Sequence, residues 1–175
     1  MAHNLTRAYI GVGSNINPGE NIEKALVKLT KHVAVTGIST FHRTSPVGDS
    51  DQDDFMNGVF RIATSRTAGD LKFSVLRTIE TELDRRRTED ARAPRTIDLD
   101  LLLWGELVSS EPRLRIPDPD IYTRPFIAFP LMELDPDLRL PDTGMFISDV
   151  TKTMSNNALQ PDIPFSRKLQ RSINI

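Results

Sequence analysis

Two aspartates, Asp98 and Asp100, stand one residue apart in a segment of otherwise alternating apolar residues. The apolar residues of segment 94–104 that share one parity are Ile97, Leu99, Leu101 and Leu103. Successive side chains of a β-strand point to opposite faces, so the alternation predicts a strand whose polar face carries both carboxylates about 7 Å apart. Mg²⁺ prefers such oxygen ligands together with substrate phosphates, which indicates metal-assisted phosphoryl or pyrophosphoryl transfer. For the pair alone, solvated acids on an exposed strand face are the alternative interpretation.

A set of arginines lies just upstream of the two aspartates in the sequence. They are Arg85, Arg87, Arg92 and Arg95. A guanidinium group stays charged, binds phosphate oxygens bidentately and offsets the charge that develops during phosphoryl transfer. Taken alone, the arginines are compatible with a solvated surface loop, but charged groups of opposite sign clustered together often mark a site. The sequence therefore predicts that the acids and the arginines meet at one site for a metal and an anion.

An aromatic residue and a carboxamide form a second candidate pair. Phe55 and Asn57 share one face of a segment that is rich in aromatic and β-branched residues. A planar heterocycle needs a ring to stack on and a group that both donates and accepts hydrogen bonds, and this pair offers both. Packing of Phe55 in the hydrophobic core is the alternative.

Several common sites are excluded by residue type or spacing. The segment that begins at Gly11 and Gly13 has Ile16 where a dinucleotide-binding loop needs its third glycine, and no P-loop motif occurs. We expect this glycine segment to form a tight turn and to shape the wall of a pocket. The three histidines lack the spacing of a zinc site, and the chain contains no cysteine.

Composition sets further bounds on the class of protein. The chain has 175 residues, of which 38% are hydrophobic, and a formal net charge of -2. Such a chain fits one domain with a hydrophobic core, and it has no overall positive field that would recruit nucleic acid or an anionic membrane. The sequence has no apolar run of ~20 residues and no signal-peptide pattern at its start, so we expect a cytoplasmic protein.

Periodicity along the chain predicts an α+β architecture. Strands are expected at residues 8–12, 35–43, 55–64 and 94–104, and helices at 18–33 and 67–84. The order β-α-β-β-α-β is that of the ferredoxin-like fold, in which helices pack on an antiparallel sheet. We expect residues 1–158 to form this single domain and residues 159–175 to be a weakly ordered C-terminal tail.

The chain resembles the 6-hydroxymethyl-7,8-dihydropterin pyrophosphokinases of folate biosynthesis over about residues 8–142. The resemblance is carried by YIGVGSN at 9–15, FHRTSPVG at 41–48, DFMN at 54–57, PRTIDLDL at 94–101, RPF at 124–126 and FPL at 129–131. It implies the ferredoxin-like fold and the transfer of diphosphate from ATP to the hydroxymethyl group of the pterin, with release of AMP. Small molecules, the pterin and ATP, are then the expected partners of a monomer.

The resemblance also implies a role for individual residues. Asp98 and Asp100 would hold two Mg²⁺ ions, and Arg85 and Arg95 would act with them as catalytic residues on the phosphates. The expected pterin contacts are Phe55 and Phe126 on the two ring faces, with Asn57, Thr44 and Val47 at the ring edge. The expected ATP contacts are Arg77, Glu80, Arg85, Arg87, Arg92, Arg113, Asp118 and Arg124.

Arg92 and Asp118 are the two main departures from the family pattern, and Asp84, Ser45 and Arg77 are lesser ones. Arg92 stands where the family usually has tryptophan, and Asp118 stands where it usually has histidine. Asp118 brings negative charge toward ATP unless a cation neutralises it. A diverged pterin-binding paralogue with weak, absent or altered nucleotide chemistry is therefore the alternative function. An RNA-binding module is disfavoured, because the sequence lacks the aromatic RNA-binding motif and a net basic surface.

Overall fold

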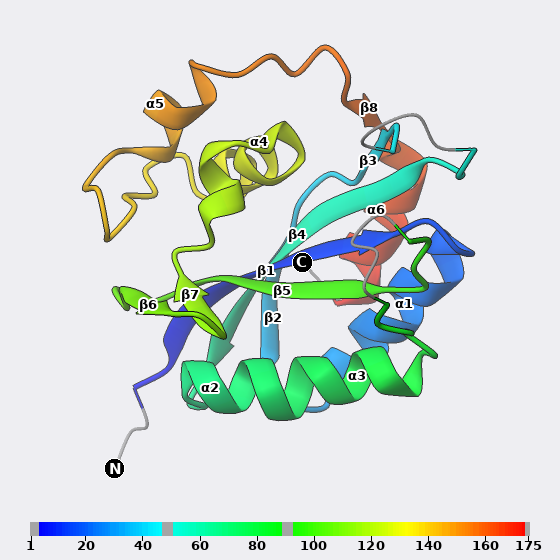
Figure 1. Cartoon of the computed structure of the whole chain (residues 1–175), viewed down its shortest axis with the longest axis horizontal. Helices are drawn as coiled ribbons and strands as arrows, with labels where there is room; N and C mark the ends of the chain where they lie inside the picture. The colour runs from blue at the N-terminus through cyan, green and yellow to red at the C-terminus, as the bar shows by residue number, and fades with distance from the viewer. Residues whose placement is uncertain (1–3, 47–50, 89–92, 174–175) are drawn as a thin grey trace.

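An antiparallel sheet forms the centre of the molecule. The computed structural model describes residues 4–46, 51–88 and 93–173. Within these ranges the main sheet has the strand order β5-β1-β4-β3-β8, with β2 also paired to β4 (Figure 1). The strands are β1 (Thr6–Ser14), β2 (Ala34–Ile38), β3 (His42–Thr44), β4 (Phe55–Thr64), β5 (Asp98–Trp104) and β8 (Gln160–Pro161). The pairings between these strands are antiparallel, which confirms the predicted α+β, ferredoxin-like class.

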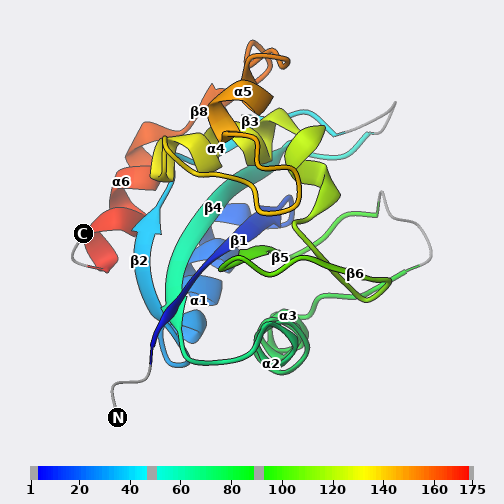
Figure 2. The same cartoon turned by 90° about the vertical axis from the view of Figure 1, so that its left-hand side faces the viewer.

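Helices cover both faces of the sheet. The helical elements are α1 (Pro18–Leu29), α2 (Ala68–Asp70), the π-helix η1 (Leu71–Leu76), α3 (Arg77–Glu82), the 3-10 helix η2 (Pro119–Tyr122), α4 (Pro125–Leu134), α5 (Ile147–Thr151) and α6 (Ile163–Ser172). Figure 2 shows α4 on one side of the sheet and α1 and α3 on the other. A small second sheet pairs β6 (Ser109–Glu111) with β7 (Leu114–Ile116). None of the helices in the described ranges is long and apolar enough to cross a membrane.

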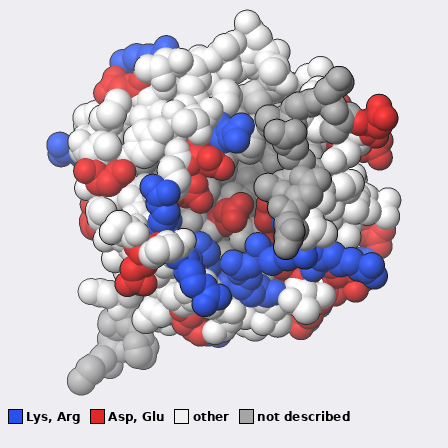
Figure 3. Space-filling view, viewed as in Figure 1, with Lys and Arg blue, Asp and Glu red and all other residues white. Residues whose placement is uncertain are grey.

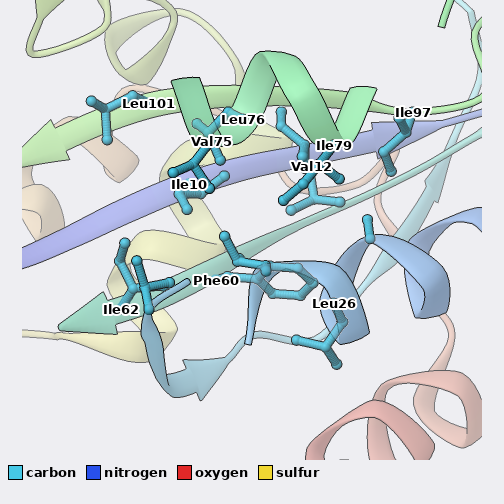
Figure 4. Close-up of a cluster of buried hydrophobic side chains, with 14 of the residues drawn as sticks. Ile10, Val12, Leu26, Phe60, Ile62, Val75, Leu76, Ile79, Ile97 and Leu101 are labelled. Atoms are coloured by element: carbon cyan, nitrogen blue, oxygen red, sulfur yellow. The ribbon is translucent and has the colours of Figure 1, made fainter. Parts of the chain in front are cut away.

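The larger hydrophobic core lies between the sheet and the helices α1, η1 and α3. Figure 4 shows Ile10 of β1 and Phe60 of β4 in a cluster with Leu26 of α1. Leu76 of η1 and Ile79 of α3 belong to the same cluster. Each of these side chains is at most 2% exposed. Helical spacing in both sequence segments places the apolar residues on one face, so the predicted helices at 18–33 and 67–84 are confirmed in kind and approximate extent.

A β-bulge in β5 corrects the predicted alternation of residues 97–103. Leu101 pairs with Ile10 and Leu103 pairs with Tyr9, so two steps on β5 match one step on β1. An extra residue in one strand reverses which face the following side chains occupy. Leu101 therefore packs in the core beside α1 and α3, whereas Leu103 packs on the opposite face beside α4. The prediction that Leu103 shares a face with Leu101 is wrong.

The predicted strand at 35–43 is interrupted near its middle. β2 ends at Ile38 and β3 begins at His42, and the buried Ser39 lies between them. The Ser39 hydroxyl accepts a hydrogen bond from the Val59 N–H at 2.9 Å, and the Ser39 N–H donates to the Val59 carbonyl at 3.0 Å. A serine side chain thus takes the place of one backbone acceptor, and the chain enters β3 as a separate strand.

Residues 159–173 are ordered, which corrects the predicted weakly ordered tail. β8 pairs with β3, and α6 packs on the core through Leu169, which is 1% exposed. Ser166 accepts a hydrogen bond from the Phe41 N–H at 2.8 Å, and the Phe165 ring meets the Phe41 ring edge-on at 5.7 Å. These contacts join α6 to the chain just before β3. A short polar helix with few apolar residues gives a weak sequence signal, because its burial depends on distant partners.

We expect Leu169→Ala to lower the free energy of unfolding by about 2–5 kcal/mol, because the truncation leaves a cavity in the core. Urea denaturation followed by circular dichroism measures this change. The matched control is Ile163→Ala on the same helix, where the side chain is 40% exposed and the expected cost is smaller. Equal stabilities of the two variants would show that α6 does not pack as described.

Candidate active site

A cavity of about 480 Å³ opens on the face of the sheet that also carries α4. Figure 3 shows acidic side chains at the base of a hollow and a band of Lys and Arg along one side of it. The lining residues come from β1, β4, β5, the approach to β5, β3 with the two residues after it, and the segment from Asp118 to α4. They are Gly11, Val12, Gly13, Thr44, Ser45, Pro46, Phe55, Asn57, Gly58, Arg95, Asp98, Asp100, Leu102, Asp118, Asp120, Arg124, Phe126 and Ile127.

Two glycines of β1 form the floor of this cavity. Gly13 pairs with Asn57 on one side and with Asp98 on the other, so the amide and the acid lie on neighbouring strands with a glycine between them. A Cβ at Gly13 would lie 2.7 Å from the Asn57 Oδ1 atom, which is too close for a stable contact. Gly13 lies within β1 instead of in the predicted tight turn, and its lack of a side chain keeps the cavity open.

Acidic side chains line the side of the cavity nearest β5. Asp98 and Asp100 both reach it, as their strand spacing predicts, and Asp118 and Asp120 join them from η2. Asp100 is open to water in the cavity but surrounded by protein. This partial burial raises the pKa of Asp100 well above the ordinary value, and the negative charges of Asp98, Asp118 and Glu80 raise it further. Burial likewise raises the pKa of Asp118. Such a group of acids favours a cation.

Two largely buried arginines face the same acids. The Arg95 Nη1 atom lies 2.5 Å from Asp98 Oδ2, and the Arg85 Nη2 atom lies 3.7 Å from Asp98 Oδ1. The side chains of Arg85 and Arg95 are only 10% and 18% exposed. Burial lowers the pKa of Arg85, and the charge of Asp98 opposes this shift. The Arg95 guanidinium also lies 5.6 Å from the centre of the Phe55 ring, so one arginine connects the acidic and aromatic parts of the cavity.

The carboxylates fit a metal ion that shares its ligands with a substrate. Among the described residues, no three acid, histidine or cysteine side chains are grouped closely enough to hold a metal ion. Mg²⁺ is commonly bound by one or two carboxylates together with substrate phosphates and water. Asp98 and Asp100 match that donor set.

The aromatic part of the cavity is formed by Phe55 from β4 and Phe126 from α4. Asn57 lies beside Phe55 and donates a hydrogen bond from Nδ2 to Thr44 Oγ1 at 2.8 Å. This bond fixes the amide plane, since Asn57 is only 9% exposed. A flat ring with donors and acceptors along its edge fits this arrangement.

Asn15 joins two segments that carry site residues. Its Oδ1 atom accepts a hydrogen bond from the Arg95 N–H at 2.8 Å, and the backbone N–H groups of Asn15 and Ile16 donate to the Arg95 carbonyl at 3.1 and 3.2 Å. Asn15 Nδ2 donates to Gln52 Oε1 at 3.1 Å and to the Asp53 carbonyl at 3.3 Å. The buried amide therefore connects the approach to Phe55 with the approach to Asp98, a role that the sequence analysis missed.

The structure gathers most of the predicted site residues in one place. The predicted residues that line the cavity are Thr44, Phe55, Asn57, Arg95, Asp98, Asp100, Asp118, Arg124 and Phe126. Arg85 reaches the site through its ion pair with Asp98. Val47 and Arg92 lie outside the described residues. Asp120 was missed, although its position two residues after Asp118 in an acidic segment was the available signal.

Besides Arg85, four of the described residues that were predicted to contact the nucleotide do not line the cavity. They are Arg77, Glu80, Arg87 and Arg113. Arg77 lies half-buried in α3, and the Arg113 guanidinium lies 5.7 Å from the centre of the Phe73 ring. Glu80 is 2% exposed and forms an ion pair with Arg87 at 2.6 Å. The structure therefore gives Glu80 a buried place in contact with protein groups.

A known protein family matches most of the chain. The model of the family described as 7,8-dihydro-6-hydroxymethylpterin-pyrophosphokinase (HPPK) matches residues 9–136. The chain belongs to the HPPK family. The matched range includes all of the predicted site residues, and only β8, α5 and α6 of the assigned helices and strands lie beyond it.

Individual relatives support the HPPK assignment. The chain is 39% identical over 142 residues to the 2-amino-4-hydroxy-6-hydroxymethyldihydropteridine pyrophosphokinase of Pseudomonas aeruginosa, covering 79% of this chain and 86% of the relative. It is 35% identical over 166 residues to the enzyme of the same name from Haemophilus influenzae, covering 89% and 97%. A crystal structure of Plasmodium falciparum HPPK-DHPS matches with a TM-score of 0.66 at 13% identity, covering 98% of this chain and 45% of that one, and supports the fold alone.

Proposed function

We propose that this HPPK family member transfers diphosphate from ATP to the hydroxymethyl group of 6-hydroxymethyl-7,8-dihydropterin and releases AMP, as a step of folate biosynthesis. The observation that carries the proposal is one cavity with paired carboxylates and Arg95 at one end and two phenylalanines with a fixed amide at the other, with Arg85 paired to Asp98 from beside the cavity. The two ends match the two substrates, a polyphosphate with its metal and a flat heterocycle.

The acceptor is proposed to bind at the aromatic end. Phe55 and Phe126 would stack on the two faces of the pterin ring, and Asn57 would read its edge by donating and accepting hydrogen bonds. Thr44 holds the Asn57 amide in place. Val47, which lies outside the described residues, is the further proposed edge contact.

The nucleotide is proposed to bind with Mg²⁺ at the acidic end. Asp98 and Asp100 would hold the metal, and two ions are proposed because the two carboxylates project from one rigid strand beside a triphosphate. Bound Mg²⁺ neutralises phosphate charge and orients the reacting oxygens. Arg85 and Arg95 would contact the phosphates directly. Further proposed nucleotide contacts are Arg77, Arg87, Arg92, Arg113, Asp118 and Arg124.

The reaction needs no protein nucleophile. The pterin hydroxyl oxygen attacks the β-phosphorus in line, and the bond from that phosphorus to the oxygen bridging it to the α-phosphorus breaks. AMP leaves with the bridging oxygen, and the hydroxyl proton passes to water. Rate enhancement then depends on holding the hydroxyl oxygen and the β-phosphorus in position for in-line attack and on neutralising phosphate charge. The largely buried Arg85 and Arg95 suit this role, because charges act more strongly where water is excluded. We further propose that the protein acts as a monomer in the cytoplasm, without nucleic-acid or membrane partners.

Chromatography of a mixture of the protein with ATP, Mg²⁺ and 6-hydroxymethyl-7,8-dihydropterin tests the proposal. AMP and the pterin diphosphate should form in equal amounts. AMP formation no greater than that of an Asp98→Asn variant would contradict the proposed function. Pterin binding without AMP formation would favour the diverged paralogue instead.

We expect Gly13→Ala to weaken pterin binding about tenfold, because the added methyl group would displace Asn57 from its hydrogen bond with Thr44, which is worth about 1 kcal/mol or more. The new Cβ would lie 2.7 Å from Asn57 Oδ1. Isothermal titration calorimetry measures the affinity for the pterin and, separately, the affinity for a non-hydrolysable ATP analogue. The affinity for the ATP analogue should change little.

Gly69→Ala is the matched control, since a Cβ there meets no atom within 4 Å. If Gly13→Ala binds the pterin as tightly as Gly69→Ala does, then the fixed Asn57 amide is not part of the pterin site.

A further inference from the structure

Glu80 is a buried acid next to the site but not in it. It is 2% exposed and does not line the cavity. Burying a carboxylate is costly unless protein groups replace the water that it loses. The groups that contact the Glu80 oxygens therefore indicate the structural role of this buried side chain.

One Glu80 oxygen supports the strand of the paired aspartates. Glu80 Oε1 accepts a hydrogen bond from the Leu99 N–H at 2.9 Å, and Leu99 stands between Asp98 and Asp100. β5 is at the edge of the main sheet in the described part of the chain, with β1 on its inner side. A backbone N–H on the outer side of an edge strand has no strand partner. Glu80 supplies that partner at the residue flanked by both carboxylates.

The other side-chain oxygen of Glu80 and its backbone carbonyl contact Arg87 and Arg85. Glu80 Oε2 lies 2.6 Å from the Arg87 Nη2 atom, and the Glu80 carbonyl accepts a hydrogen bond from the Arg85 N–H at 2.9 Å. Arg85 in turn reaches Asp98. Glu80 of α3 is thus bonded both to β5, the strand that carries the two aspartates, and to residues 85–87, which follow α3.

We propose that Glu80 is a positioning residue that fixes Asp98 and Asp100 relative to Arg85 and Arg87, so that a metal–nucleotide complex meets a preformed set of ligands. The proposal rests on the proposed function and replaces a direct contact between Glu80 and ATP. Outer groups that orient metal ligands typically contribute 10- to 100-fold to metal affinity or activity.

Glu80→Ala and Glu80→Asp test this role. Glu80→Ala removes both side-chain contacts, and Glu80→Asp keeps the charge but is one methylene too short to make both. We expect each to weaken binding of Mn²⁺ with α,β-methylene-ATP, measured by electron paramagnetic resonance, by about 10- to 100-fold. Glu80→Gln keeps a carbonyl oxygen for the Leu99 N–H but turns an NH₂ donor toward Arg87, so its affinity should lie between those of Glu80→Ala and the wild type.

The control variant is Glu82→Ala, which removes an acid from the same helix that pairs with Lys28 at 2.7 Å, away from the cavity. It should bind the Mn²⁺ complex like the wild type. Wild-type affinity in a folded Glu80→Asp variant would overturn the proposal even if Glu80→Ala does not fold. A Glu80→Gln variant that binds the Mn²⁺ complex more weakly than Glu80→Ala would do the same. Failure of the proposed function would instead appear in the wild-type protein, as no AMP formation.

Discussion

Asp98→Asn and Asp100→Asn are each expected to lower kcat for AMP formation by at least about 10³-fold. Metal ions stabilise phosphoryl-transfer transition states by several kcal/mol, and about 4 kcal/mol corresponds to 10³ in rate. An amide oxygen is a neutral and weaker ligand than a carboxylate. The loss should be large in either variant, because no third acid in the described residues is placed to complete a metal site with the other.

A stability measurement distinguishes a variant that has lost a metal ligand from one that no longer folds. Asp100 is crowded by protein and by the charges of Asp98, Asp118 and Glu80, which raise its pKa. Its ionised form therefore costs folding free energy above the ordinary pKa of an aspartate, and that cost is absent at lower pH. Asp100→Asn should accordingly unfold at an equal or higher urea concentration than the wild type at neutral pH, while losing activity.

Rapid-quench measurement of AMP at saturating substrates gives kcat, and the Mn²⁺ affinity of each variant gives the metal binding. Asp149→Asn is the matched control, since Asp149 pairs with Lys152 at 2.7 Å on the surface of α5. Turnover near that of the wild type in Asp98→Asn or Asp100→Asn would contradict the assignment of these acids to the metal.

The paired acids were predictable because their signal is local. Alternation of apolar and acidic residues places Asp98 and Asp100 on one strand face whatever lies around the strand. The reversal at Leu103 was not predictable, because the bulge arises in the pairing of β5 with β1. Element order likewise predicted the sheet and its helices, whereas the packing of α6 depends on Phe41, more than a hundred residues earlier.

The roles of residues that position other site residues were the hardest to predict from the sequence. Asn15 and Glu80 look like a turn residue and a helix acid, and their roles depend on the distant partners Arg95 and Leu99. Gly13 is a further example. Its sequence context indicates a turn, but its function in the structure is the absence of a Cβ beside Asn57. Spacing identifies the groups that do chemistry, and only tertiary contacts identify the groups that hold them.

Arg95→Ala is expected to lower kcat by about 10³-fold, in the range that a transition-state arginine contributes to phosphoryl transfer. Arg95 is held on three sides, by Asn15 at its backbone, by Asp98 at 2.5 Å and by the Phe55 ring at 5.6 Å. Its guanidinium is therefore fixed before substrate binds, and the arrangement places positive charge between the acidic and aromatic ends of the cavity. Charge that is fixed in advance favours the transition state, because no reorganisation is needed during the reaction.

The comparison of kcat with binding distinguishes this role from simple attraction of ATP. The affinity for the pterin should fall only about two- to fivefold, since a partly exposed cation–π contact is worth about 0.5–1 kcal/mol. Arg95→Lys keeps the charge but lacks the planar fork, so its kcat should lie between those of Arg95→Ala and the wild type. Arg66→Ala is the control, because Arg66 pairs with Asp70 at 2.6 Å outside the cavity. If Arg95→Ala raised the KM for ATP and left kcat unchanged, then Arg95 would serve binding alone, and the charge that stabilises the transition state would have to come from Arg85 and the metal.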